Sequence, residues 1–115
     1  MDIGDRGVRV LFNAKRFIIA TILYIRGQLT MAELQRYTGL SWGDLDSNVR
    51  MLSKYGLVEA RKVLTESGPR TRLRLTRKGE EAYEKLSVLL KNIISRAEEA
   101  KRETDNRDNR RVSSN

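Results

Sequence analysis

The chain has 115 residues, no cysteine, no histidine and a formal net charge of +8 at pH 7. This length allows one domain with a modest core. The composition excludes a disulfide framework, thiolate chemistry, the usual zinc ligands and every catalytic arrangement that needs histidine. The positive charge favours a polyanionic partner, with nucleic acid ahead of an anionic membrane surface and of a merely solvated basic surface.

Membrane and enzyme functions both lack a signal in the sequence. The longest apolar run, residues 17–20, is too short to span a bilayer or to form the core of a signal peptide, so the expected location is the cytoplasm. No nucleophile–base arrangement and no phosphate-binding loop is visible. We therefore expect a protein that is not an enzyme and that has no cofactor, metal or membrane partner.

The N-terminal part combines an irregular segment with a long apolar helix. Residues 1–9 contain two glycines and two aspartates without a clear period, so a flexible arm is expected there. Asn13 is positioned to cap the first long helix, and Gly27 to end it. The helix is apolar on nearly all sides, which predicts burial on more than one of them. Residues 28–30 suit a short strand.

Two short helical patterns then lie on either side of Gly39. The first begins with Thr30 and Glu33, spaced as a capping box, and the second with Ser41 and Asp44 at the same spacing. Gly39 suits a turn that needs a positive φ, and helix, short turn and helix form the helix-turn-helix pattern. A plain corner between two helices is the alternative for this stretch alone. The buried face of the second helix is predicted from Leu45, Val49 and Leu52.

The next segment predicts a β-hairpin. Residues 57–65 and 70–75 read as strands, joined by a turn cluster at 66–69. In the second strand arginines alternate with Thr71, Leu73 and Leu75 without a break, which places Leu73 and Leu75 inward. Its outward residues are Arg70, Arg72 and Arg74.

A long last helix is predicted after Thr76, which is placed to cap it. Its apolar stripe extends beyond what so small a domain can cover, so we favour cover by a second copy of the chain over cover within the chain. The helix is expected to end near residue 104. The stripe residues assigned to dimerisation are Leu86, Leu89, Leu90, Ile93, Ile94 and Ala97.

The elements together predict a mainly α-helical fold with a small β-hairpin. We divide the chain into a flexible arm at 1–9, a winged helix-turn-helix DNA-binding domain at 10–79, a C-terminal dimerisation helix at 80–104 and a disordered tail at 105–115. The tail is polar and charged, with a single apolar residue, so it has too little apolar surface to fold.

From Arg16 to Leu86 the chain resembles the small winged helix-turn-helix transcriptional regulators of bacteria and archaea. The relatives are MarR- and ArsR-like proteins, in particular a compact subgroup without ligand or metal sites. The most specific fragment is the arginine-rich second wing strand, which ends in the pattern Leu-Thr-x-x-Gly. The fragments that carry the resemblance are residues 29–34, 38–41, 45–52, 54–58 and 70–79.

The resemblance implies a homodimer that binds double-stranded DNA, with paired last helices and one recognition helix in the major groove of each half-site. The recognition-helix residues that would approach bases are Trp42, Gly43, Ser47, Asn48 and Arg50. Lys54 lies on the same predicted face and is either a DNA contact or ordinary surface. The wing residues that would approach phosphates or the minor groove are Lys62, Arg70 and Arg72.

Two carboxylates in the recognition helix depart from the usual pattern, because carboxylates near DNA repel phosphates. We expect Asp44 to act as a cap partner, whereas Asp46 either accepts a hydrogen bond from a cytosine amino group or faces away. Trp42 either packs at the helix start or contacts DNA. Two other functions stay open: a non-specific architectural DNA-binding protein of the chromatin type, and a winged-helix module that binds proteins.

Overall fold

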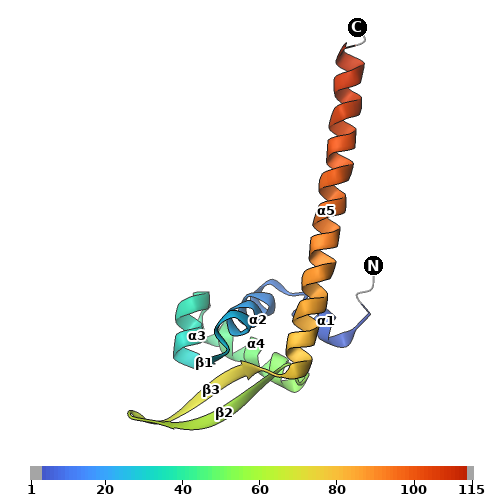
Figure 1. Cartoon of the computed structure of the whole chain (residues 1–115). Coiled ribbons are helices and arrows are strands. Elements are labelled where there is room, and N and C mark those ends of the chain that lie inside the picture. The colour runs from blue at the N-terminus through green and yellow to red at the C-terminus, as the bar shows by residue number, and fades with distance from the viewer. Residues whose placement is uncertain (1–3, 114–115) are drawn as a thin grey trace.

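The computed structural model describes residues 4–113, and most of them are helical (Figure 1). The β-hairpin projects from one side of a small helical body, and the last helix rises from it, so that the molecule measures 75 × 28 × 22 Å. The predicted fold class, mainly α-helical with a small β-hairpin and a long last helix, is confirmed. The elements in chain order are α1 (Arg6–Leu11), α2 (Ala14–Arg26), β1 (Gln28–Thr30), α3 (Met31–Thr38), α4 (Trp42–Lys54), β2 (Val58–Thr65), β3 (Gly68–Leu75) and α5 (Arg77–Ser113).

The capping residues of the sequence determine where the helices begin. Asn13 caps α2, because its side-chain oxygen accepts a hydrogen bond of 3.1 Å from the backbone N–H of Arg16. Thr30 and Glu33 form a complete capping box at the start of α3, with both hydrogen bonds at 3.1 Å. The backbone N–H of Thr30 also lowers the pKa of Glu33. Gly39 ends α3 with a φ of 69°.

The three strands form one antiparallel sheet in the order β1-β3-β2. Leu29 in β1 lies opposite Leu73 in β3, so the predicted short strand is present and pairs with the wing. The hairpin is longer than the sequence predicted, because β3 begins at Gly68 and only Glu66 and Ser67 form the turn. Gly68 takes a φ of 101°, which a residue with a side chain rarely adopts.

The core joins all five helices of the described part of the chain. Its largest fully buried side chains are Leu11, Ile19, Leu23, Leu34, Leu45, Leu52, Leu57 and Leu86. The prediction that α2 is buried on more than one side agrees with its packing, since α2 contacts α3, α4 and β3 and its Phe17 stacks on Tyr83 of α5. On its outer side, Ile18 is 42% exposed and Ile25 is 69% exposed.

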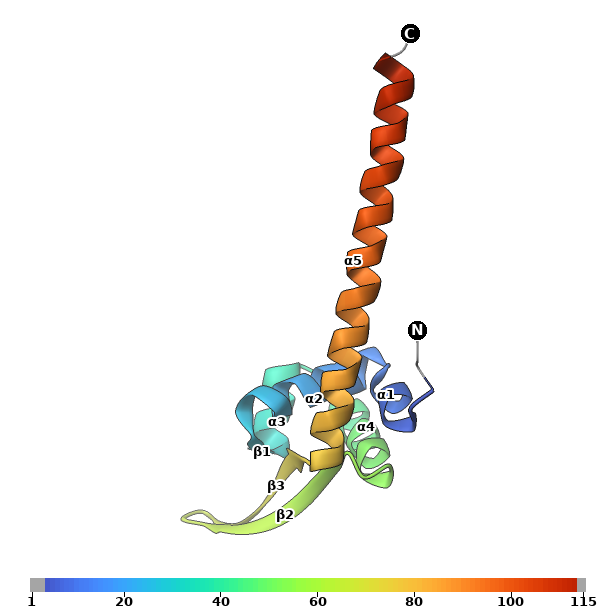
Figure 2. The same cartoon turned by 45° about the vertical axis from the view of Figure 1, so that its right-hand side comes forward.

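The predicted flexible arm is wrong for the part that the structure describes. Asp5 caps α1 by accepting a hydrogen bond of 3.1 Å from the N–H of Val8, and its carboxylate lies 3.3 Å from the ammonium of Lys85 in α5. Val8 and Leu11 are buried, and α1 packs beside the base of α5 (Figure 2). Six residues are too few for helical periodicity to be visible, which explains the error. Residues 1–3 lie outside the described part.

The predicted disordered tail is also wrong as far as the structure describes it, since α5 continues past residue 104 to Ser113. No glycine or proline follows Gly79, so no residue stops the helix. Extending an existing helix needs no new nucleation, and i,i+4 ion pairs such as Lys101–Asp105 at 3.2 Å add to its stability. Residues 114–115 lie outside the described part.

Among the described glycines, Gly79 in the first turn of α5 lies closest to another segment of backbone. A Cβ at this position would lie 2.0 Å from the carbonyl oxygen of Leu57, so Gly79→Ala has to displace either α5 or the segment that leads into β2. We expect this change to lower the free energy of unfolding by about 2–3 kcal/mol. Chemical denaturation at a fixed protein concentration measures it.

Gly43→Ala in α4 is the matched control, because nothing lies within 4 Å of a Cβ there. Alanine is the better helix former, so this variant should gain up to about 1 kcal/mol. A denaturation midpoint of Gly79→Ala equal to that of the wild type would contradict the close contact between α5 and Leu57.

Candidate nucleic-acid interface

The outward face of α4 lies opposite its buried residues Leu45, Val49 and Leu52. Ser41 begins the helix by accepting a hydrogen bond of 3.1 Å from the N–H of Asp44. The tryptophan at the first position is 55% exposed, so it does not pack into the core. The sequence-predicted residues on this face are Gly43, Ser47, Arg50 and Lys54, and the exposed Trp42 lies at its flank.

Asn48 differs from the other predicted contacts of α4, because its side chain is used within the protein. Its amide nitrogen donates to the carbonyl oxygen of Asp44 at 2.7 Å, and its amide oxygen accepts from the guanidinium of Arg16 at 3.3 Å. The residue is half-buried at the junction of α2 and α4. Its geometry suits holding α2 against α4 better than reading a base.

The two carboxylates of α4 are both neutralised within the chain. Asp44 lies 2.7 Å from the ammonium of Lys15 in α2, and this ion pair lowers the pKa of Asp44 below its ordinary value of 3.8. Its carboxylate therefore joins two helices, and it also interacts with the hydroxyl of the capping residue Ser41, which lowers its pKa further. Asp46 lies 2.9 Å from the guanidinium of Arg50, one turn further along α4. Each pairing reduces the repulsion of an approaching phosphate.

The strand register determines which wing residues share a face. Arg61 lies directly opposite Arg72, and Val63 lies opposite Arg70, so these three arginines lie on one face of the hairpin. Lys62 lies opposite Thr71 and therefore projects from the other face. Both faces of the outer hairpin are thus cationic. Arg61 is not among the sequence-predicted wing residues, because the strand register that places it opposite Arg72 is not visible in the sequence.

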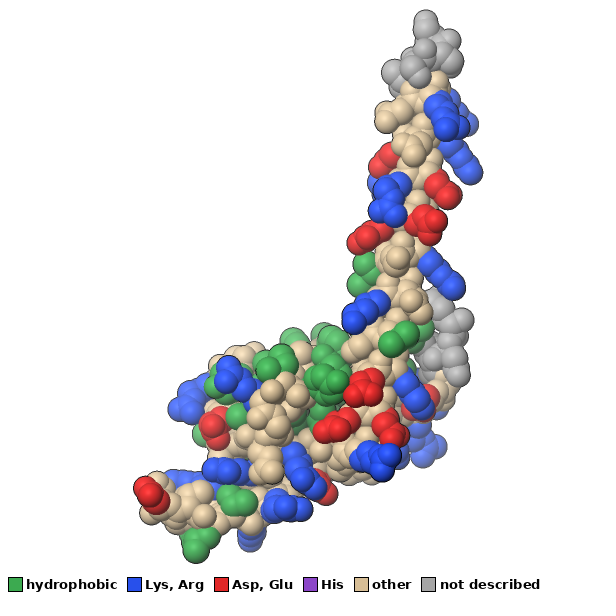
Figure 3. Space-filling view, viewed as in Figure 1, with side chains coloured by type: hydrophobic (Ala, Val, Ile, Leu, Met, Phe, Trp, Pro, Cys, Tyr) green, Lys and Arg blue, Asp and Glu red, His purple; other side chains and the backbone are tan. Residues whose placement is uncertain are grey.

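The remaining wing arginine, Arg74, is not free for a ligand, because it pairs with Glu59 across the strands. Among the described residues, neither Arg61 nor Arg70 has an ion-pair partner, and both are exposed. Basic side chains are visible along the hairpin in the space-filling view (Figure 3). The outer hairpin therefore offers uncompensated positive charge.

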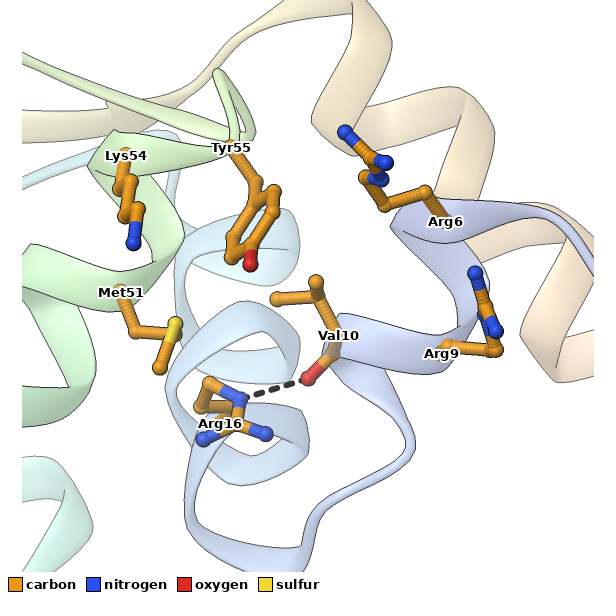
Figure 4. Close-up of a pocket in the computed structure, with 7 residues that line it drawn as sticks. All are labelled: Arg6, Arg9, Val10, Arg16, Met51, Lys54 and Tyr55. Carbon is orange, nitrogen blue, oxygen red and sulfur yellow. Dashed lines mark hydrogen bonds between the residues drawn. The ribbon is translucent and has the colours of Figure 1, made fainter.

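A second group of cations lies where the sequence predicted a flexible arm. Arg6 and Arg9 of α1 face the end of α4, where they form a basic cleft together with Arg16 and Lys54 (Figure 4). The spacing of Arg6 and Arg9 could have indicated two cations on one side of a helix, whereas Arg16 belongs to α2 and joins them only through the packing of the two helices.

The predicted dimerisation stripe divides into two parts. Leu86 is fully buried in its own chain, and Leu89 and Leu90 pack partly on the core. Further along α5, Ile94 is 55% exposed and Ala97 is exposed. Hydrophobic side chains also gather over the upper surface of the body beside α5 (Figure 3). The exposed side chain of Phe12 lines a pocket together with Leu86 and Leu90 of α5.

The described residues contain no group of three or more histidine, cysteine, aspartate or glutamate side chains that could hold a metal ion. Within residues 4–113, no helix has both the length and the apolar character that crossing a membrane requires.

Comparisons with known proteins identify the fold and the family. A family model described as a winged helix DNA-binding domain matches residues 15–94. A transcriptional regulator homologue from Pyrococcus horikoshii OT3 is 32% identical, with a TM-score of 0.70 over 76% of this chain and 86% of that chain. A MarR-family transcriptional regulator from Enterococcus faecalis V583 is 25% identical, with a TM-score of 0.72 over 84% of this chain and 86% of that chain. No curated protein matches.

The matched region contains the helix-turn-helix, the wing and the first half of α5, which are the elements that form the candidate interface. The chain therefore belongs to the winged helix DNA-binding domain family, as a small winged helix-turn-helix transcriptional regulator similar to those of the MarR type.

Proposed function

We propose that this protein is a sequence-specific regulator that binds double-stranded DNA as a homodimer, with α4 in the major groove. The observation that carries the proposal is the outward face of α4, which is exposed along its length and lies between two groups of uncompensated cations. A major groove admits one α-helix, and the phosphates that border it need neutralising charge.

Base recognition is assigned to the exposed face of α4. Arg50 can donate a bidentate pair of hydrogen bonds to guanine, because its side chain is 79% exposed and its pair with Asp46 is a surface ion pair of small energy. Ser47 can donate to or accept from a base edge, and Trp42 offers an apolar surface to a thymine methyl group. Lys54 lies at the far end of this face, where a phosphate contact is the simplest role.

The wing is assigned to the DNA backbone. Arg70 and Arg72 share one face with Arg61, and Lys62 lies on the other. A ribbon that enters a minor groove has a phosphate strand on either side, so cations on both faces suit this position. These contacts contribute affinity without discriminating between sequences.

Dimerisation is assigned to α5. The stripe that contains Ile93 and Ile94 continues beyond the body of its own chain, where no other described element covers it. A second copy related by a two-fold axis would cover it with the same surface. Two recognition helices would then address two half-sites of a palindrome.

Gly43 gives a test of how closely α4 approaches DNA. Glycine destabilises a helix relative to alanine, and the space around Gly43 is empty, so protein packing does not require a glycine there. We expect Gly43→Ala to stabilise the fold while weakening operator binding by about 1.4 kcal/mol, roughly tenfold, because a Cβ would separate the helix from the base edges. Titration with operator DNA measures the loss. Tighter binding by the more stable variant would contradict this close approach.

The function as a whole is tested by selecting sites from a random DNA pool and titrating the selected and scrambled duplexes at several salt concentrations. A palindromic site bound at least about a thousandfold more tightly than scrambled DNA is the expected result. Salt-dependent binding without preference would favour the architectural alternative. Absence of binding at low salt would favour a protein-interaction module.

A further inference from the structure

A basic cleft lies between α1 and the C-terminal end of α4. It has a volume of about 640 Å³, and we call it the α1–α4 cleft. Figures 1 and 2 show α1 and the wing on opposite sides of α4. The residues that line the α1–α4 cleft are Arg6, Arg9, Val10, Arg16, Met51, Lys54 and Tyr55 (Figure 4).

The cleft concentrates positive charge around one aromatic ring. The guanidinium carbon of Arg6 lies 5.9 Å from the ring centroid of Tyr55, and the ammonium of Lys54 lies 5.7 Å from the same centroid. Arg16 forms the floor, because its Nε donates to the carbonyl oxygen of Val10 at 2.6 Å. Arg9 is exposed at the outer edge. These four cations are therefore held on three different helices.

No carboxylate compensates this charge, since none lines the cleft. Among residues 4–113, neither Arg6 nor Arg9 takes part in an ion pair, and the neighbouring Asp5 is engaged by Lys85 and by the N-terminus of α1. Like charges within about 10 Å repel each other at moderate ionic strength. An anion bound in the cleft would remove this repulsion.

The position of the cleft indicates which anion it takes. Lys54 belongs both to the cleft and to the outward face of α4, so the two surfaces are continuous. A helix in the major groove has one phosphate backbone on each side, because the groove is only about 12 Å wide. The wing lies on one side of α4, and the α1–α4 cleft lies on the other.

We propose that the α1–α4 cleft binds phosphates of the DNA backbone that borders the recognition helix on the side away from the wing. The proposal rests on the proposed function and adds a second backbone contact to it. In this arrangement Arg6 and Arg9 reach the phosphates, Lys54 lies between backbone and groove, and Arg16 holds α1 and α4 at the spacing that the contact needs.

The test compares Arg6→Ala/Arg9→Ala with the matched control Arg96→Ala/Arg102→Ala, which removes the same charge from exposed positions on α5. Each protein is titrated with selected and scrambled duplexes over a salt series. We expect the cleft variant to bind both DNAs at least about tenfold more weakly and to lose about two or more units of the log–log salt slope per dimer. The control should keep the wild-type slope.

A second measurement uses the wild-type protein and locates the contact on the DNA. Neutral methylphosphonates replace single phosphates of the selected site, one position at a time. The expected result is a cluster of positions, on the backbone opposite the wing, that weaken wild-type binding but leave the binding of the cleft variant unchanged. The melting temperatures of the variants should not fall below that of the wild type, because both arginine side chains are exposed.

Different results overturn different statements. If the wild type binds DNA and the cleft variant behaves like the α5 control, the cleft proposal fails and the proposed function stands. If the wild type binds no duplex at low salt, both fail. The last measurement uses inorganic phosphate. If phosphate raises the melting temperature of the wild type but not of the cleft variant, and both proteins bind DNA equally well, the cleft binds small anions instead of DNA.

Discussion

Two glutamates on the stripe of α5, at Ile93 and Ile94, are expected to convert the protein from dimer to monomer and to weaken operator binding about a hundredfold or more. Ile94 is 55% exposed in the single chain, and Ile93 is only half-buried, so the change leaves the core of each protomer intact. In a dimer the introduced glutamates would be buried at the interface as charges without partners. A monomer binds only one half-site at a time, so it loses the gain in affinity from two linked recognition helices, which is about a hundredfold.

The measurement is light scattering at micromolar concentration, where the wild type should have twice the 13.3 kDa mass of one chain. The control is Asn92→Glu/Ser95→Glu, which adds the same charge at exposed positions on the other side of α5. It should remain dimeric and bind DNA as the wild type does. A monomeric wild type would contradict the proposal that the protein is a homodimer. A dimeric Ile93→Glu/Ile94→Glu variant would show that the dimer interface is not formed by this stripe of α5.

Loss of both free arginines from one face of the wing is the second large effect that we expect. Arg61→Ala/Arg70→Ala removes four cations from a dimer, and each charged contact is worth about 1 kcal/mol or more. Binding to operator and random DNA alike should therefore weaken by about 4 kcal/mol, roughly a thousandfold. The log–log salt slope should fall by about 3–4 units, since each phosphate contact contributes about one.

Arg50→Ala should behave differently, because Arg50 is assigned to a base and not to a phosphate. We expect operator binding to weaken by about 1–3 kcal/mol more than binding to random DNA. Both variants are titrated with both DNAs over the same salt series, with Arg96→Ala/Arg102→Ala as the control for net charge. Equal weakening of both DNAs by Arg50→Ala would show that α4 does not read bases through Arg50, and would favour the architectural alternative.

Lys62→Ala tests whether both faces of the wing contact the DNA backbone. Lys62 projects from the face opposite Arg61 and Arg70, although it is their neighbour in sequence. If the wing enters a minor groove between two backbones, Lys62→Ala should lower the salt slope by about two units per dimer. An unchanged slope would limit the backbone contact to the face that contains the arginines.

The sequence by itself determined the elements whose cause is local. The capping box of Thr30 and Glu33, the cap of Asn13 and the left-handed Gly39 depend on groups only a few residues apart, and each appears in the structure as predicted. The alternating second wing strand likewise determined which residues face inward, since side chains alternate along a strand. The family followed from the order of these elements.

The tertiary structure decided what depends on contacts between distant segments. Arg61 is the neighbour of Arg72 because of the strand register, and Asn48 is occupied because α2 brings Arg16 to it. Helix α1 forms because Asp5 caps it and its apolar side chains pack on α5, a contact across some 80 residues of chain that no local pattern shows. The α1–α4 cleft depends on that packing, because the burial of Val8 and Leu11 holds α1 in place against the repulsion among the cations of the cleft.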